Sequence, residues 1–306
     1  MPRSAPAFGD RLAAWVSARE SQMVLGLDPD PAALWPGCEP TQAGSPAARA
    51  AEAVLAHCFA LIDAAGPACV AIKPQLARFE ALGAPGWEAL EATIHYAGDR
   101  GLLAIADGKR GDIDVSADAY ARALMGFTET PWGQVRGLRA EMATVNPLMG
   151  ADALAPFVAV ARLQDRCPLV LVRTSNPGAA DFEELELADG GRLWERMART
   201  VDALGSENVG DCGLGDVGAV VGATAPEQLA RARELMPRAV FLLPGVGAQG
   251  GRVEDLAPAF APGRAGGLIA ASRSIANAHA NAGGSPADAA RAEAERLREL
   301  AWGLSR

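Results

Sequence analysis

Residues 102–112 read LLAIADGKRGD, an apolar run that ends abruptly in charged side chains. Such a run before a turn is typical of a buried strand in a parallel sheet. Side chains two positions apart in a strand face the same side, so Asp107 and Lys109 are expected to project together, with Asp112 in the following turn. A charge at the end of a buried strand must be paired or solvated, because an isolated buried ion is very costly.

Similar apolar runs recur along the chain, each followed by a longer segment with helical spacing. The predicted strands are Met23–Leu27, Cys69–Ile72, Leu102–Ala106, Met142–Val145, Leu169–Val172, Val217–Val221, Val240–Leu243 and Gly267–Ala270. The predicted helical stretches are 47–65, 75–98, 115–125, 150–162, 191–204, 225–236 and 285–302, with a short connection near 252–259.

This alternation predicts an α/β protein of about eight βα units, which close naturally into a (β/α)₈ TIM barrel. We expect residues 1–306 to form a single domain, with an extra N-terminal helix in 1–20, a C-terminal helix in 285–306 and inserted loops at 126–140 and 174–190. The second loop is either a lid or an ordinary insertion. An open doubly wound sheet is the alternative fold, since a linear sequence does not show closure.

Composition narrows the class of protein. The net charge of −9 argues against nucleic-acid binding, which normally needs a basic face. Five scattered cysteines without a CxxC pair, together with only three histidines, predict reduced thiols and no metal site. No signal-like or membrane-spanning apolar segment is evident, so we expect a cytoplasmic protein that does not bind a membrane.

Two other predicted strands also end in ionisable groups. Asp28 follows the first strand and Lys73 follows the second, which places them near Asp107 and Lys109 at one end of a barrel. An alternating array of carboxylates and lysines keeps each ammonium protonated and so provides a positioned proton donor. The simpler interpretation is a structural ion pair, with Asp112 or Asp114 capping the next helix.

A second constellation follows the last two predicted strands. Residues 244–251 read PGVGAQGG, and Arg273 stands just beyond the eighth strand. Barrels commonly bind phosphate with these two loops, because glycines let backbone N–H groups approach an anion and arginine can hold two of its oxygens. Taken alone, a glycine-rich turn is more often only a turn.

The segments DGKRGDI, VNPLMGADALAPF, LVRTSNPGAADF and LLPGVGAQGG, with the upstream Asp28 and Lys73, resemble the orotidine 5′-phosphate decarboxylases, in particular their longer bacterial (type 2) subgroup. The resemblance runs from about Asp28 to Ser274. It implies decarboxylation of orotidine 5′-phosphate to uridine 5′-phosphate in pyrimidine biosynthesis, without a cofactor or metal.

The resemblance also implies roles for single residues. Lys109 would protonate C6 of the pyrimidine, Asp107 would lie against the substrate carboxylate, and Lys73 would bridge Asp107 and the ribose. Asp28 would hold a ribose hydroxyl, and Ser175 would meet the polar edge of the pyrimidine. Asp112 and Ser116, where the family usually has Thr, would reach the site of the neighbouring subunit in a homodimer with shared active sites. The phosphate would be held by the loop that contains Pro244, Gly247 and Gln249, and by Arg273.

Bland interpretations remain for two of these residues. Ser116 is also a suitable hydroxyl for a helix start, and Ser175 for capping the turn before Asn176.

Two rival functions remain. One is a related phosphate-binding barrel enzyme, such as a hexulose-phosphate synthase or a keto-gulonate-phosphate decarboxylase, which shares an Asp-x-Lys arrangement but works with magnesium and an enediolate. The other is a non-catalytic nucleotide-binding protein, which would not need a lysine clamped between carboxylates.

Overall fold

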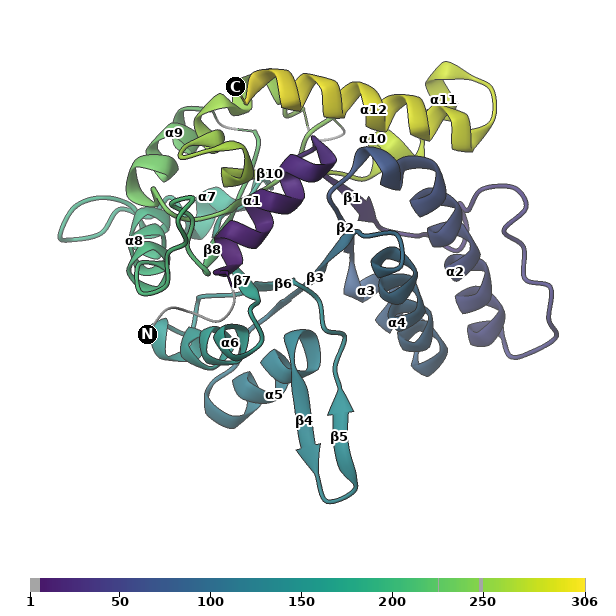
Figure 1. Cartoon of the computed structure of the whole chain (residues 1–306), viewed down its shortest axis with the longest axis horizontal. Coiled ribbons are helices and arrows are strands. Elements are labelled where there is room, and N and C mark those ends of the chain that lie inside the picture. The colour runs from purple at the N-terminus through teal and green to yellow at the C-terminus, as the bar shows by residue number, and fades with distance from the viewer. Residues whose placement is uncertain (1–5, 225, 248–249, 306) are drawn as a thin grey trace.

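A closed barrel of eight parallel strands forms the centre of the computed structural model, which describes residues 6–224, 226–247 and 250–305 (Figure 1). The strands follow one another around the barrel in the order β1-β10-β9-β8-β7-β6-β3-β2. Their bounds are β1 (Met23–Leu27), β2 (Ala71–Pro74), β3 (Leu103–Arg110), β6 (Met142–Val145), β7 (Cys167–Arg173), β8 (Gly218–Val221), β9 (Phe241–Pro244) and β10 (Gly267–Ala271). The predicted TIM barrel is confirmed, and an open sheet is excluded.

Helices surround this barrel. They are α1 (Phe8–Arg19), α2 (Pro46–Ala65), α3 (Leu76–Glu80), α4 (Ala84–Gly98), α5 (Asp114–Met125), α6 (Ala151–Leu163), α7 (Ala179–Phe182), α8 (Leu193–Gly205), α9 (Pro226–Leu235), α10 (Arg273–Ala276), α11 (His279–Ala282) and α12 (Pro286–Leu304), with 3₁₀ turns η1 (Gly66–Ala68), η2 (Val253–Phe260) and η3 (Arg264–Gly266). The predicted helix 75–98 is in fact two helices, because Gly83 has a φ of 69° and interrupts the helical backbone between them.

The segment 126–140, predicted as a loop, contains a β-hairpin. Strands β4 (Phe127–Thr130) and β5 (Gly133–Arg136) pair antiparallel and project away from the barrel (Figure 1). The Thr130 hydroxyl donates to the Gly133 carbonyl at 2.6 Å and closes the turn. The loop prediction was wrong here because it followed the Gly and Pro content and overlooked the alternation of β-formers on either side.

The barrel interior is packed by alternate residues of the strands. Leu103 and Ile105 of β3 belong to the cluster inside the barrel, whereas Ala104 and Ala106 belong to the cluster between the barrel and the helices. Helix α1 adds Phe8, Leu12 and Val16 to the inner cluster, so it closes the N-terminal end of the barrel. The inner core therefore fills one end and leaves the opposite end for polar side chains.

The stretch Pro46–Ala68, which is α2 with η1, is long and apolar enough to cross a membrane by length and composition. Of its most apolar window, 56% is buried inside the protein. Helix α2 packs against α4 and α12, which is how a core helix of a barrel is expected to lie.

Candidate active site

A cavity of about 460 Å³ opens where the barrel strands end. Its lining includes residues from, or just beyond, all eight strands, which is where active sites of this architecture lie. Asp28, Lys73, Asp107 and Lys109 all line it. The four strand-end charges picked out in the sequence therefore share one cavity.

The central feature of the cavity is a carboxylate held between two ammonium groups. Lys73 Nζ lies 2.7 Å from Asp107 Oδ2, and Lys109 Nζ lies 2.6 Å from Asp107 Oδ1. The side chains of Asp107 and Lys73 are 7% and 9% exposed, whereas that of Lys109 is 44% exposed. Lys73 is thus a buried counter-ion, and Lys109 is the ammonium that an incoming ligand can reach.

These contacts fix the charge states of the buried pair. Burial alone would raise the pKa of Asp107, but the charges of Lys73 and Lys109 outweigh it and lower the pKa to about 2. Burial would lower the pKa of Lys73, but Asp107 and Asp28 outweigh it and raise the pKa above its ordinary value. Both groups are therefore ionised at neutral pH.

Strand β3 continues to Arg110, four residues beyond its predicted end, and it is irregular where it carries the charges. Its register against β6 shifts between Ala106 and Arg110, and Lys109 has a φ of 48°. A bulge of this kind re-aims side chains next to active sites, and a left-handed non-glycine residue costs about 1–2 kcal/mol. The bulge lets both charged side chains of the Asp-Gly-Lys segment reach the cavity.

Thr144 of β6 is a member of the site that sequence reasoning missed. Its buried hydroxyl donates to Asp107 Oδ1 at 2.9 Å and accepts the backbone N–H of Lys109 at 2.9 Å. One hydroxyl thus holds both the carboxylate and the strained backbone of the lysine. The available signal was a polar residue at an inward-facing position of the otherwise apolar strand Met142–Val145, two residues after the inner-core Met142.

Asp28 differs from the other charged residues of the site. It lines the cavity, and its Oδ1 is buried without a hydrogen-bond partner among the described residues. A buried carboxylate oxygen of this kind is suited to accept a hydrogen bond from a ligand hydroxyl.

The remaining predicted residues fall into three groups. Ser175, Pro244 and Arg273 line the cavity. Within the described residues, Asp112, Ser116 and Gly247 do not belong to its lining. Asp112 lies in the turn after β3, where its Oδ1 accepts the Ile113 N–H at 2.8 Å, and Ser116 is exposed in the first turn of α5. Gln249 lies outside the described residues.

No group of three or more His, Cys, Asp or Glu side chains that could hold a metal ion occurs within residues 6–224, 226–247 and 250–305. The five cysteines are free thiols in the described structure, and burial raises the pKa of Cys58 and Cys69 to about 12.

Comparison with known proteins decides the family. Residues 21–291 match the model of the orotidine 5′-phosphate decarboxylase / HUMPS family. The chain belongs to this family. An orotidine 5′-phosphate decarboxylase of Rhodopirellula baltica is 38% identical over 89% of each chain, and one of Roseiflexus castenholzii is 40% identical over 94% of this chain and 93% of its own. The structure of Leishmania donovani OMP decarboxylase, 32% identical, superposes with a TM-score of 0.72 and covers 96% of this chain and 99% of its own.

The lowered pKa of Asp107 predicts a specific loss of stability in acid. A carboxylate whose folded-state pKa is depressed stabilises the fold above its unfolded pKa of 3.8 and loses that contribution as the pH falls toward 2. We expect the free energy of unfolding to fall by roughly 2 kcal/mol from this group between about pH 4 and pH 2. Urea unfolding of the wild type and of Asp107→Asn across this range measures it. The stability difference between the two proteins should shrink as the pH falls, and a constant difference would contradict the assignment.

Proposed function

We propose that this chain decarboxylates orotidine 5′-phosphate to uridine 5′-phosphate and carbon dioxide in pyrimidine biosynthesis, with Lys109 as the proton donor. The observation that carries the proposal is the cluster of Lys73, Asp107 and Lys109, two ion pairs that share one carboxylate at the mouth of a closed barrel. The relatives that match about nine-tenths of the chain, and that are named as decarboxylases of this substrate, support it.

The chemistry needs a cation where negative charge develops. When the bond from C6 to the carboxylate breaks, the electron pair stays on C6, in an orbital that cannot delocalise well into the ring. Lys109 gives its proton to that carbon as carbon dioxide leaves, and the neutral amine regains a proton from water. Because the ammonium is already fixed at 2.6 Å from Asp107, it needs little reorganisation during the step.

Asp107 has two effects in this scheme. It holds Lys109 in place, and its negative charge faces the position of the substrate carboxylate, which it disfavours in the bound substrate. Binding of the distant phosphate by Arg273 and the β9 loop offsets that unfavourable approach. Ser175 contacts the polar edge of the pyrimidine, and Asp28 accepts a hydrogen bond from a ribose hydroxyl.

The partners of the site are also part of the proposal. Asp112 and Ser116 share their segment with Val115, which is 78% exposed, and Leu148 in the 146–149 segment is 73% exposed. Gly111 lies against Asn146 and Met149, which brings the 111–116 and 146–149 segments together. A second copy of the chain would cover this surface and receive Asp112 and Ser116 in its cavity, which gives a homodimer with shared sites.

We also propose that the whole chain acts as one cytoplasmic domain. Helix α1 closes the N-terminal end of the barrel, and α12 packs against α2, so both terminal helices pack onto the barrel.

One assay distinguishes the proposed decarboxylase from the rival barrel enzyme that works with magnesium and an enediolate. The decrease in orotidine 5′-phosphate absorbance is followed with purified wild-type protein in EDTA, beside Lys109→Ala at equal concentration. We expect turnover to continue in EDTA and to fall by at least about 10⁴-fold in Lys109→Ala, because the proton donor and its charge are both removed. Loss of turnover in EDTA favours the magnesium rival. Tight uridine 5′-phosphate binding by a folded wild type without decarboxylation favours the non-catalytic protein.

The role of Thr144 gives a second prediction. Thr144→Val keeps the shape of the side chain but leaves the Lys109 N–H without its partner and Asp107 Oδ1 with Lys109 Nζ alone. We expect kcat to fall about 10–100-fold with a smaller change in KM, since the geometry of the proton donor is lost rather than a substrate contact. Thr144→Ser retains the hydroxyl and should stay within a few-fold of the wild type. Equal losses in both variants would contradict this role, because Thr144→Ser keeps the hydroxyl.

Shared sites predict complementation between two inactive variants. When Lys109→Ala and Asp112→Ala chains are co-expressed with different tags, a mixed dimer has one site with Lys109 from one chain and Asp112 from the other. We expect roughly a quarter of wild-type activity after random pairing, because half of the dimers are mixed and each has one intact site. If Asp112 served the cavity of its own chain, the mixture would stay as inactive as its parents.

A further inference from the structure

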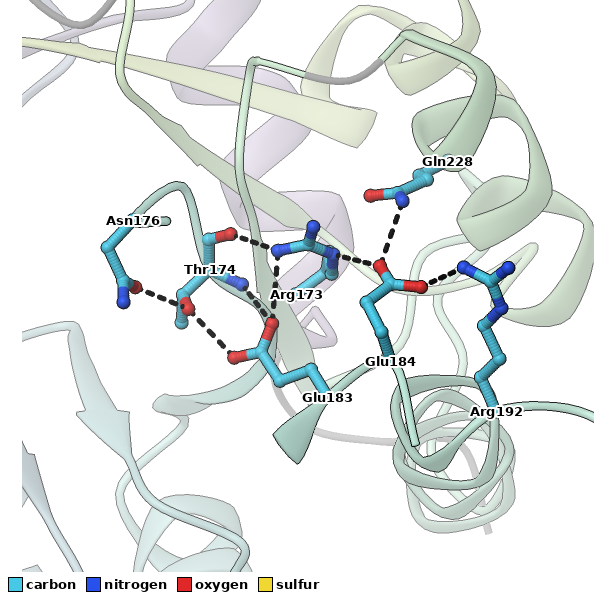
Figure 2. A network of polar contacts seen from close by, with 7 residues as sticks. All are labelled: Arg173, Thr174, Asn176, Glu183, Glu184, Arg192 and Gln228. Carbon is cyan, nitrogen blue, oxygen red and sulfur yellow. Dashed lines mark hydrogen bonds and ion pairs between the residues drawn. The ribbon is translucent and has the colours of Figure 1, made fainter. Parts of the chain in front are cut away.

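The end of β7 holds a network of charged groups that has no part in the chemistry described above. Arg173, the last residue of β7, lies between Glu183 and Glu184, which follow the short helix α7 (Figure 2). Arg173 Nη1 lies 3.2 Å from Glu183 Oε2, and Nε lies 2.9 Å from Glu184 Oε1. All three side chains are about 85% buried.

The inner half of this network grips the peptide group that leads into Ser175. Glu183 accepts the Thr174 N–H at 2.9 Å and the Thr174 hydroxyl at 2.8 Å, while Arg173 donates to the Thr174 carbonyl at 2.5 Å. That carbonyl belongs to the peptide bond between Thr174 and Ser175. The orientation of the Ser175 backbone is thus set by Arg173 and Glu183, neither of which lines the cavity among the described residues.

The outer half of the network holds Arg173 in place through Glu184. Glu184 pairs with Arg192 at the start of α8 and accepts a hydrogen bond from Gln228 of α9 at 2.9 Å (Figure 2). Burial would raise the pKa of Glu184, but the hydrogen bond from Arg192 and the charge of Arg173 outweigh it and lower the pKa. Glu184, which is held by residues of α8 and α9, thereby balances the positive charge of Arg173.

Ser175 is also supported from the barrel side. A Cβ atom on Gly222 would lie 3.0 Å from the Cα, Cβ and N atoms of Ser175, and the Gly222 N–H donates to the Arg173 carbonyl at 2.7 Å. The Ser175 backbone is therefore confined between the loop after β8 and the Arg173–Glu183 clamp. Such two-sided support is what keeps a binding group in one geometry.

We propose that Arg173 and Glu183 are positioning residues that act through Ser175, fixing the part of the cavity that recognises the base of the nucleotide. This inference rests on the proposed function, in which Ser175 meets the pyrimidine. It assigns base recognition to a buried clamp outside the cavity. Phosphate recognition lies with other loops, at Arg273 and after β9, so the two recognition elements should respond separately to mutation.

The test compares a ligand with a base and a ligand without one. Inhibition constants of uridine 5′-phosphate and ribose 5-phosphate, and KM and kcat for orotidine 5′-phosphate, are measured for the wild type and Glu183→Gln. Glutamine is neutral and has a single carbonyl oxygen. It therefore cannot accept the Thr174 N–H and the Thr174 hydroxyl on two charged oxygens, as Glu183 does. We expect uridine 5′-phosphate to bind about tenfold more weakly, the loss of roughly one hydrogen bond, while ribose 5-phosphate changes less than about twofold.

Three further substitutions, one of them also combined with Glu183→Gln, make the result specific. Asp189→Asn removes an exposed carboxylate from the same segment and should behave as the wild type. Ser175→Ala, alone and combined with Glu183→Gln, forms a double-mutant cycle. If Glu183 acts through Ser175, the double variant should bind uridine 5′-phosphate no more weakly than Ser175→Ala does. Thr174→Val removes the hydroxyl that Glu183 accepts and leaves both carboxylates paired with Arg173. It replaces Glu183→Gln in the test if that variant does not fold. We expect it to weaken the binding of uridine 5′-phosphate in the same way but by a smaller factor.

The outcomes separate this inference from the function beneath it. Wild-type affinity for uridine 5′-phosphate in Glu183→Gln, equal weakening of both ligands, or additive effects in the cycle would each overturn the positioning role and leave the decarboxylase proposal intact. A wild type that neither binds uridine 5′-phosphate nor consumes orotidine 5′-phosphate would overturn both.

Discussion

The site depends on one constraint, which is that a carboxylate buried in a barrel must be neutralised where it stands. An isolated buried carboxylate would cost several kcal/mol or would take up a proton. Asp107 stays ionised because Lys73 comes from the neighbouring strand β2 and Lys109 comes from its own strand, each with an N–O distance below 2.8 Å. The two ammonium groups in turn tolerate each other only because the carboxylate lies between them. The two buried charges, Asp107 and Lys73, are not stable in this place without their partners, so the pairing of β2 with β3 and the electrostatics of the site depend on each other.

The same constraint explains where the backbone is strained. A regular strand would direct Asp107 and Lys109 to the same side, above Leu103 and Ile105. The register shift in β3 and the left-handed φ of Lys109 bring its side chain back over the carboxylate. Thr144 offsets part of that cost, because its hydroxyl accepts the N–H that the irregular backbone leaves free and donates to the carboxylate at the same time. Strain, ion pair and hydrogen bond thus support one another at the position where the cavity meets the core.

Short apolar runs, each followed by a segment with helical spacing, made much of this predictable from the sequence. They located all eight barrel strands, and β1 and β6 match their predicted bounds. Period-two alternation then placed Asp107 and Lys109 on one side of their strand. The sequence did not reveal the bulge or the extension of β3 to Arg110, since charged residues normally mark the end of a strand. The β4–β5 hairpin was missed because its glycines and proline masked a short alternating pattern. Thr144 was missed because a threonine in a strand is ordinary until its neighbours in space are known, and so was the Arg173 clamp, whose members are ten or more residues apart around a short helix.

The charge distribution in the cavity shows how an acidic protein can favour an anion. The chain carries a formal charge of −9, yet its cavity is lined by Lys73, Lys109 and Arg273 against two carboxylates, Asp28 and Asp107. The excess of positive charge is not spread evenly. Around Asp107 the lysines are engaged by a carboxylate, whereas Arg273 stands beyond β10, which is three positions from β3 around the barrel. A ligand with a phosphate at one end and a carboxylate at the other would be attracted at the Arg273 end and opposed by Asp107 at the other. Attraction at the remote group then supplies the free energy with which the reacting group is held against a like charge, and that opposition disappears when the carboxylate leaves as neutral carbon dioxide.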